Sequence, residues 1–288
     1  ILLGRKDVIS DLMQSINFQE EVSILDPKSD EQLEIKSKYA NLFWNEQKRK
    51  GVTLYEAESL MRERNYFAAM MVKNGDADAM LSGYSRNYAS VIKPVLDVVG
   101  KDKGVSKIAA TNMMLTDRGP IFISDTSINI DPTAKELAKI GFMTSEIVKM
   151  FGIKPVMAML SYTNFGSSKH PNAGKVTDAV AYLHRYYPDL VVDGPLQSDF
   201  ALNREMLEER FPFSEIAKKN VNTLIFPNLE SANITYKLMK ELNKNQSVGP
   251  ILLGLKEPIH VLQLGASVDE IVNMAAVAVI DAQQKQKR

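Results

Sequence analysis

Short apolar runs alternate with longer amphipathic segments along nearly all of this 288-residue chain. Several of the short runs are almost continuously apolar, which is typical of parallel strands that are buried on both faces. We predict strands at Ile1–Gly4, Val22–Asp26, Ala79–Gly83, Ile108–Leu115, Pro120–Ser124, Val156–Ser161, Val191–Gly194, Thr223–Pro227 and Ile251–Gly254.

Between these runs, apolar residues recur with helical periodicity. One predicted helix covers Tyr55–Asn74 after a Thr53 cap, and another begins at Asp131-Pro132 and ends at Phe151, just before Gly152. Further helices are predicted at Thr177–Tyr186, Leu202–Glu209, Ala232–Asn243 and Val268–Gln284. Strands that alternate with helices over this length predict an α/β fold with a mostly parallel sheet.

Two polar segments suggest that the chain forms two lobes. Residues Gly100–Gly104 form one candidate hinge, and Lys256-Glu257-Pro258 forms a second after a buried strand. The length exceeds what one ordinary core organises. We therefore expect a first α/β domain of residues 1–103 plus 256–288 and a second of residues 104–255, with a cleft between them.

The amino-acid composition argues against several classes of protein. Hydrophobic residues make up 45% of the chain, which argues against disorder, and 35 basic residues balance 35 acidic ones, so no net field attracts nucleic acid. There is no cysteine, and His170, His184 and His260 lack the close spacing of a zinc site. No apolar run is long enough to cross a bilayer and no signal peptide is visible, so we expect a cytoplasmic protein without a metal or a membrane partner. The opening Ile1–Arg5 reads as the end of a buried strand, which suggests a piece of a longer protein.

Candidate chemistry lies in polar loops after predicted strands, where open α/β sheets bind ligands. Asn164 to Lys169 includes Gly166-Ser167-Ser168-Lys169, a turn whose backbone N–H groups can cradle phosphate. An ordinary polar loop is the alternative. No P-loop and no dinucleotide glycine motif occurs.

Two basic segments offer sites for an anion. Gln47-Lys48-Arg49-Lys50-Gly51 is the strongest basic cluster, and Arg86, Asn87 and Lys93 follow the predicted strand Ala79–Gly83. The alternative for the first is a solvated helix end whose cations interact with the helix dipole.

Ordered motifs over almost the whole chain resemble the phosphate acetyltransferase and butyryltransferase family. They are Lys50-Gly51-Val52-Thr53, Gly75-Asp76-Ala77-Asp78-Ala79, Ser82-Gly83, Met159-Leu160-Ser161-Tyr162, Gly166-Ser167, Asp193-Gly194 with Leu196-Gln197 and Asp199, Ile225-Phe226-Pro227-Asn228-Leu229 with Asn233-Ile234, Gly249-Pro250-Ile251, Gly254-Leu255, and Gly265 with Ser267 and Ile271-Val272. The resemblance implies two α/β domains of the phosphotransacetylase type, like isocitrate and isopropylmalate dehydrogenases, and a homodimer. It also implies transfer of an acyl group between phosphate and the thiol of coenzyme A, without a metal.

The chain departs from that pattern where the resemblance places catalytic groups. Where the family has Ser-Arg-Gly in its C-terminal motif, this chain has Gln263-Leu264-Gly265. Two further positions at which the family has arginine hold Gln47 and Lys93. The position of the family's catalytic aspartate holds Glu270. Losing one preorganised charge donor typically lowers the rate about 10²–10³-fold. We therefore expect little transferase activity.

Gln263-Leu264-Gly265 and the segment Val272-Asn273-Met274 resemble more closely the C-terminal domain of bacterial NADP-dependent malic enzymes. That resemblance implies an upstream domain holding NADP and a divalent metal, with acetyl-CoA or a related acyl-CoA as a regulatory ligand of a homo-oligomer. The expected acyl-CoA or phosphate ligands are Lys48, Arg49, Arg86, Asn87, Lys93, Asn164, Ser167, Lys169, Asn228 and Asn233. The alternatives are an active phosphate acyltransferase and a scaffold that only drives oligomerisation.

Overall fold

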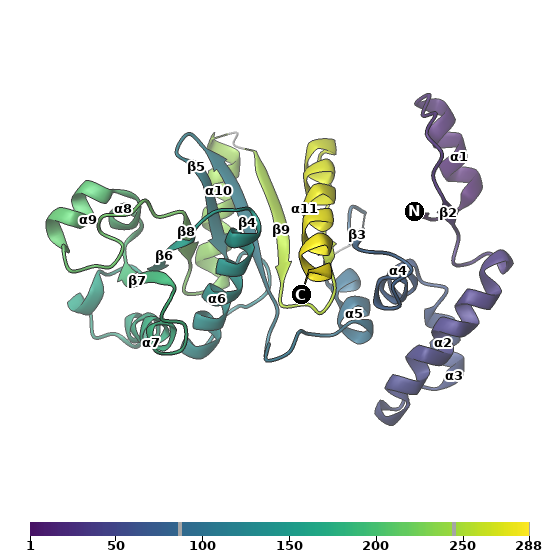
Figure 1. The fold of residues 1–288 in the computed structure, drawn as a ribbon, viewed down its shortest axis with the longest axis horizontal. Helices are drawn as coiled ribbons and strands as arrows, with labels where there is room; N and C mark the ends of the chain where they lie inside the picture. The colour runs from purple at the N-terminus through teal and green to yellow at the C-terminus, as the bar shows by residue number, and fades with distance from the viewer. Residues whose placement is uncertain (86–87, 244–245, 288) are drawn as a thin grey trace.

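The computed structural model describes residues 1–85, 88–243 and 246–287, and its largest element is a six-stranded sheet of order β7-β6-β8-β5-β4-β9 (Figure 1). Its strands are β4 (Ala109–Thr116), β5 (Gly119–Ser124), β6 (Val156–Leu160), β7 (Val191–Leu196), β8 (Thr223–Ile225) and β9 (Ser247–Leu253). The pairs β5–β8, β8–β6 and β6–β7 are parallel, while β4 is antiparallel to both β5 and β9. The turn between β4 and β5 is too short for a parallel crossover, so these two strands form a hairpin.

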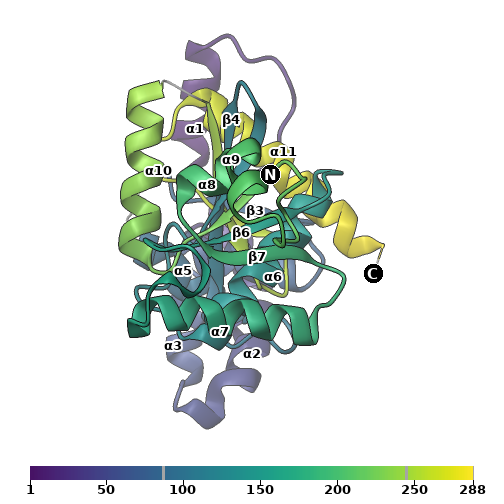
Figure 2. The same ribbon diagram turned by 90° about the vertical axis from the view of Figure 1, so that its left-hand side faces the viewer.

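Helices cover both faces of this sheet, which agrees with the predicted α/β class (Figures 1 and 2). Met157 and Met159 of β6 pack with α6 (Ala134–Met150) and α7 (Pro171–Tyr186). The alternate residues Ala158 and Leu160 pack with α8 (Ser198–Leu202), α9 (Arg204–Arg210) and α10 (Leu229–Asn243). Successive side chains of a strand point to opposite faces, so an apolar run with buried residues at every position places a helical layer on each side.

A second core lies beside the sheet around the parallel pair β3 (Met80–Ser82) and β10 (Ile259–Val261). It includes α2 (Leu33–Gln47), α3 (Leu54–Leu60), α4 (Arg64–Lys73) and α5 (Tyr88–Val98). Its large buried side chains include Tyr39, Phe43, Met61, Phe67 and Met70. The last helix, α11 (Val268–Gln286), packs Met274 and Val277 against β9 and so joins this part of the chain to the six-stranded sheet.

The predicted hinges lie next to each other. Asp102 N–H donates to Gly254 O at 2.9 Å, and Lys256 N–H donates to Gly100 O at 3.3 Å. The chain thus passes between the two cores along two adjacent, hydrogen-bonded segments. The division into residues 1–103 plus 256–288 and residues 104–255 stays a prediction.

The N-terminal segment extends away from the sheets (Figure 1). A two-residue strand β1 (Leu2–Leu3) pairs in parallel with β2 (Ile24–Leu25), and α1 (Lys6–Ser15) has no buried residue. The prediction of a buried strand at the start was wrong in this respect, because 63% of Ile1 and 44% of Leu2 are exposed. Among the described residues, no helix is both long and apolar enough to span a membrane.

Several predicted helix boundaries were wrong, and capping side chains explain three of them. The predicted helix Tyr55–Asn74 is two helices, because the Glu63 carboxylate accepts hydrogen bonds from the N–H groups of Asn65 and Tyr66 and begins α4 anew. The N-cap of α6 is Thr133, which forms a capping box with Glu136 instead of the predicted cap at Asp131. Helix α7 begins at Pro171 rather than at Thr177, with His170 as its cap.

Candidate functional site

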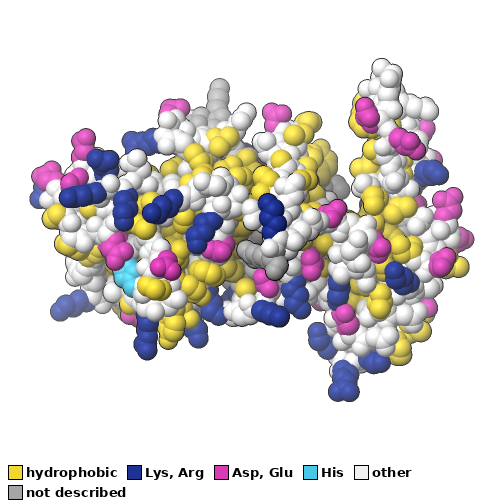
Figure 3. Space-filling view, in the orientation of Figure 1, with side chains coloured by type: hydrophobic (Ala, Val, Ile, Leu, Met, Phe, Trp, Pro, Cys, Tyr) yellow, Lys and Arg dark blue, Asp and Glu magenta, His cyan; other side chains and the backbone are white. Residues whose placement is uncertain are grey.

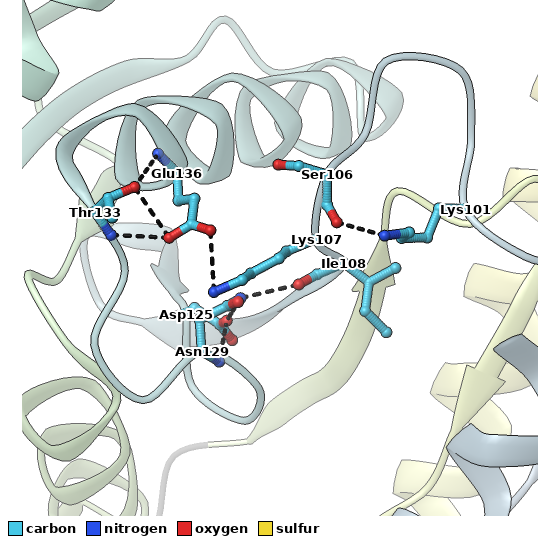
Figure 4. A network of polar contacts seen from close by, with 8 residues as sticks. All are labelled: Lys101, Ser106, Lys107, Ile108, Asp125, Asn129, Thr133 and Glu136. Carbon is cyan, nitrogen blue, oxygen red and sulfur yellow. Dashed lines mark hydrogen bonds and ion pairs between the residues drawn. The ribbon is translucent and has the colours of Figure 1, made fainter.

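The loop that follows β5 is organised by a buried carboxylate (Figure 4). Asp125 is 3% exposed and accepts hydrogen bonds from the backbone N–H groups of Ala110, Ser127, Ile128 and Asn129, and from the Asn129 side chain. Burial raises the pKa of Asp125, and these hydrogen bonds oppose that shift. Asp125 therefore fixes the shape of the loop at the carboxyl end of a sheet strand.

The same loop is tied to α10 and to β4. Asn233 Nδ2 donates to the carbonyl oxygen of Thr126 at 2.9 Å, and Asn112 Nδ2 donates to Thr126 Oγ1 at 2.5 Å. Asn228 Oδ1 accepts from Ser231 N–H at 2.9 Å in the first turn of α10. Asn228 and Asn233, both predicted ligands, thus lie at this end of the sheet, where their side-chain amides form hydrogen bonds with the backbone.

Two buried polar atoms near this loop have no hydrogen-bond partner within the described part of the chain. They are the hydroxyl of Tyr88, at the start of α5, and Oδ1 of Asn112. Burial, and secondarily the negative charge of Asp125, raise the pKa of Tyr88 far above its ordinary value. Tyr88 and Ile128, a residue of the loop after β5, both pack against the second core, so the start of α5 lies on the same core as this loop. Unpaired buried polar atoms are costly, which makes this junction a candidate binding site.

This loop was not predicted from the sequence. The signal was the polar run Ser124-Asp125-Thr126-Ser127 directly after a buried strand. The same reasoning that selected the loop after Val156–Ser161 applies to it.

The predicted phosphate turn lies after β6. Asn164 Nδ2 donates to Gln197 Oε1 at 2.6 Å, and Gln197 N–H donates to Asn164 Oδ1 at 2.8 Å, which joins the loops after β6 and β7. Ser167 and Lys169 are exposed, and the Ser167 hydroxyl bonds to Thr163 Oγ1. Asn164 therefore holds the loops after β6 and β7 together, while Ser167 and Lys169 lie at the surface.

The predicted basic cluster lies at the end of α2, on the second core. Lys48 and Arg49 are exposed, and the Lys48 ammonium lies 4.9 Å from the centre of the Trp44 ring. Gln47 Nε2 donates to the carbonyl oxygen of Asp97 at 2.9 Å. Gln47 is thus engaged with α5.

Lys93 also contacts Asp97. Its ammonium donates to Asp97 Oδ2 at 2.9 Å and to the Tyr66 hydroxyl at 3.2 Å, and Tyr66 donates to the same carboxylate oxygen at 2.6 Å. The hydrogen bond with Asp97, followed by that with Tyr66, raises the pKa of Lys93. The structure therefore brings Gln47 and Lys93 together around Asp97, a residue that the sequence analysis did not select.

The segment Gln263-Leu264-Gly265 packs beside the loop after β3. Leu262 N–H donates to Ser82 O at 2.7 Å, and Gly265 N–H donates to Tyr84 O at 3.3 Å. Gln263 is half-buried, whereas the Leu264 side chain is 72% exposed. Two further predicted ligands, Arg86 and Asn87, lie outside the described residues.

Glu270 is the third residue of α11 and closes a capping box with Ser267. Its other carboxylate oxygen accepts a hydrogen bond from Lys240 of α10 at 2.6 Å. Burial alone would raise the pKa of Glu270, but the bonds from Lys240 and from the Ser267 N–H outweigh it and lower the pKa. Both oxygens of this carboxylate therefore have structural partners.

Comparison with known proteins places this arrangement in a family. Residues 1–279 match the model described as "Phosphate acetyl/butaryl transferase". The chain belongs to this transferase family. It is 33% identical over 292 residues to a phosphate acetyltransferase of Clostridium acetobutylicum, with 99% of this chain and 86% of that protein covered. A phosphotransacetylase structure from Streptococcus pyogenes superposes with a TM-score of 0.87 at 33% identity, over 100% of this chain and 86% of that one. The predicted phosphotransacetylase type of fold is thereby confirmed.

The chain is also similar to part of a longer protein. It is 37% identical over 289 residues to an NADP-dependent malic enzyme of Escherichia coli strain K12, and 98% of this chain is covered. The chain spans only 38% of that protein's length. The predicted resemblance to the C-terminal part of such malic enzymes is therefore confirmed.

Proposed function

We propose that this chain is an acyl-CoA-binding regulatory domain of a malic enzyme, and that it no longer transfers acyl groups to phosphate. The observation that carries the proposal is the hydrocarbon side chain of Leu264, which is 72% exposed where the family resemblance places an arginine. The planar guanidinium of arginine binds phosphate with two hydrogen bonds, whereas leucine offers neither charge nor donor.

The contacts of the other altered positions support the same proposal. Gln47 is neutral and bonded to the Asp97 backbone, and the Lys93 ammonium is paired with the Asp97 carboxylate. Glu270 is held by Ser267 and Lys240, and its lowered pKa makes it a weak base for a coenzyme A thiol. Each group would have to leave a partner before it took part in catalysis.

Anion binding, by contrast, needs only accessible cations. Arg49 and Lys169 are exposed, and no ion pair to either is found in the portion of the chain that the structure describes. Coenzyme A carries phosphates that such side chains would bind. Regulation further requires that acetyl-CoA bind one state of the whole assembly more tightly than another.

The larger protein in this proposal is a homo-oligomer. Its upstream domain would oxidise and decarboxylate malate with NADP and a divalent metal. The support is the similarity to the malic enzyme of E. coli, of which this chain matches 38%.

A paired measurement tests the proposal. Calorimetry of the chain with acetyl-CoA should show binding, and Lys48→Gln/Arg49→Gln should weaken it about tenfold. Arg185→Gln is the matched control, because Arg185 lies at the end of α7 and contacts the ring of Tyr186. An assay for acetyl phosphate formation from acetyl-CoA and phosphate should show no turnover. Absence of binding up to about 1 mM acetyl-CoA would overturn the claim that the chain binds acyl-CoA. Rapid turnover would overturn the claim that it no longer transfers acyl groups to phosphate.

A second candidate is an active phosphate acyltransferase. It is favoured by the match to 86% of the length of the Clostridium phosphate acetyltransferase. In that case acetyl phosphate would form rapidly, and Lys93→Ala would abolish the activity without unfolding the chain.

A further inference from the structure

A large cavity lies at the opposite end of the sheet strands from the loops of the candidate site. Its volume is about 860 Å³, within the range of small-molecule pockets. The wall is built from the turn between β4 and β5, the junction of α8 with α9, and the segment that leads into β8. Because β5 and β8 run parallel, their amino ends meet here, whereas Asp125 and Asn228 lie beyond their carboxyl ends.

Basic side chains predominate in the wall. Arg118, Arg204 and Lys219 line the cavity, and Glu205 is the carboxylate among its lining residues. Figure 3 shows Lys and Arg side chains, with Asp and Glu side chains among them, over the end of the molecule that carries α8 and α9. The cavity therefore has a positive balance in a chain whose formal net charge is zero.

The cations differ in how they are held. Arg118 Nη1 donates to the carbonyl oxygen of Leu202 at 2.8 Å, which fixes one edge of its guanidinium to the wall. A neutral carbonyl leaves the charge of Arg118 uncompensated. Arg204 and Lys219 are exposed, and no ion pair to either occurs among residues 1–85, 88–243 and 246–287. All three cations are thus available to an anion.

The inner wall is apolar. Ile121 and Val221 line the cavity and are at most 9% exposed, and Ile153 and Leu202 are half-buried beside them. A pocket with a hydrophobic wall and a few convergent polar groups is the usual architecture of a site for a small organic ligand.

We infer that this cavity binds a phosphorylated ligand of nucleotide size. Its phosphates would pair with Arg118, Arg204 and Lys219, and its flat apolar part would lie against Ile121 and Val221. This second site is separate from the proposed acyl-CoA site and does not depend on it. No bond is made or broken in it.

Calorimetry on the whole chain, in the presence of EDTA, tests the inference with ATP, adenosine and inorganic pyrophosphate as probes. ATP should bind with a dissociation constant of about 10–500 µM, and each of the other two should bind at least about tenfold more weakly. Arg204→Gln/Lys219→Gln should weaken ATP binding about tenfold, and the loss should shrink in high salt. Circular dichroism would confirm that the variant is folded.

Two further variants sharpen the test. Glu205→Gln removes the carboxylate of the wall and should tighten ATP binding about two- to fivefold, an effect that a purely structural residue would not produce. Arg185→Gln removes a cation that belongs to neither basic cluster, because Arg185 lies at the end of α7 against the ring of Tyr186, and it should leave ATP binding unchanged. The inference is overturned if ATP does not bind up to about 5 mM, if adenosine binds as tightly as ATP, or if ATP binding is lost in Lys48→Gln/Arg49→Gln and kept in Arg204→Gln/Lys219→Gln.

Discussion

Lys240 on α10 donates a hydrogen bond of 2.6 Å to Glu270 at the start of α11. This contact joins two helices that are separated in the chain by β9 of the six-stranded sheet and β10 of the pair β3–β10. It also occupies one oxygen of the carboxylate that the family resemblance assigns to catalysis, and Ser267 occupies the other.

We expect Glu270→Ala to lower the free energy of unfolding by about 1–2 kcal/mol, since it removes both the capping box and the ion pair. Urea unfolding measures this loss. Asp269→Ala is the matched control, because Asp269 is also acidic and lies in the first turn of α11 but is exposed. Equal losses in the two variants would contradict the structural role of Glu270.

The pH dependence of the same contact has a definite sign. The folded pKa of Glu270 lies below its ordinary value of 4.5, so the stabilisation is fully present above that value and is lost as the pH falls through the lowered pKa. The stability difference between the parent chain and Glu270→Gln should therefore be largest near neutral pH and vanish in acid. A difference that stays constant from neutral pH to about pH 3 would show that the carboxylate charge contributes nothing.

Gly83 sets how closely the loop after β3 approaches the segment that carries Leu264. Its φ is +114°, and an added Cβ would lie 2.7 Å from the carbonyl oxygen of Leu262. Gly104 also has a positive φ, +76°, but an added Cβ there would meet nothing within 4 Å. Gly83→Ala should therefore destabilise the chain by about 2 kcal/mol more than Gly104→Ala in thermal or urea unfolding. Equal effects would mean that the close approach is not required.

Asp125 should be among the most sensitive polar positions in the chain. Asp125→Ala leaves several buried N–H donors without an acceptor, so we expect a loss of about 3 kcal/mol or more in the free energy of unfolding. Asp117→Ala, in the exposed turn between β4 and β5, should change stability by less than about 0.5 kcal/mol. If Asp125→Ala lowered the free energy of unfolding no more than Asp117→Ala does, Asp125 would not be the anchor of the loop.

Placing an arginine at position 264 tests directly how much transferase activity the leucine costs. Leu264→Arg should raise acetyl phosphate formation measurably, but to a level still at least about 100-fold below an active family member, because Gln47 and Lys93 remain altered. Leu264→Gln, which is polar but uncharged, should give no gain. A full return of activity in Leu264→Arg alone would show that the other changes are harmless.

Much of the architecture was predictable because buried strands have a strong apolar signal. The runs at Val156–Ser161 and Val191–Gly194 correspond to β6 and β7, and both strands are almost entirely buried. The antiparallel arrangement of β4 was missed, because an apolar run does not specify the direction of its neighbours.

The candidate site was predicted less well, since its residues are defined by contacts between distant segments. Gln47 and Lys93 meet at Asp97, and nothing in the local sequence indicates that meeting. The capping box at the start of α11, by contrast, is visible in the local sequence, because Ser267 is followed three residues later by Glu270. Family resemblance had already assigned that carboxylate another role.

The central claim is that the chain binds acetyl-CoA without exchanging its acyl group with phosphate. The most direct measurement incubates the purified chain with acetyl-CoA and inorganic phosphate, and follows free coenzyme A thiol while calorimetry follows binding. We predict saturable binding and no thiol release above the uncatalysed rate. Steady release of coenzyme A with formation of acetyl phosphate would contradict it.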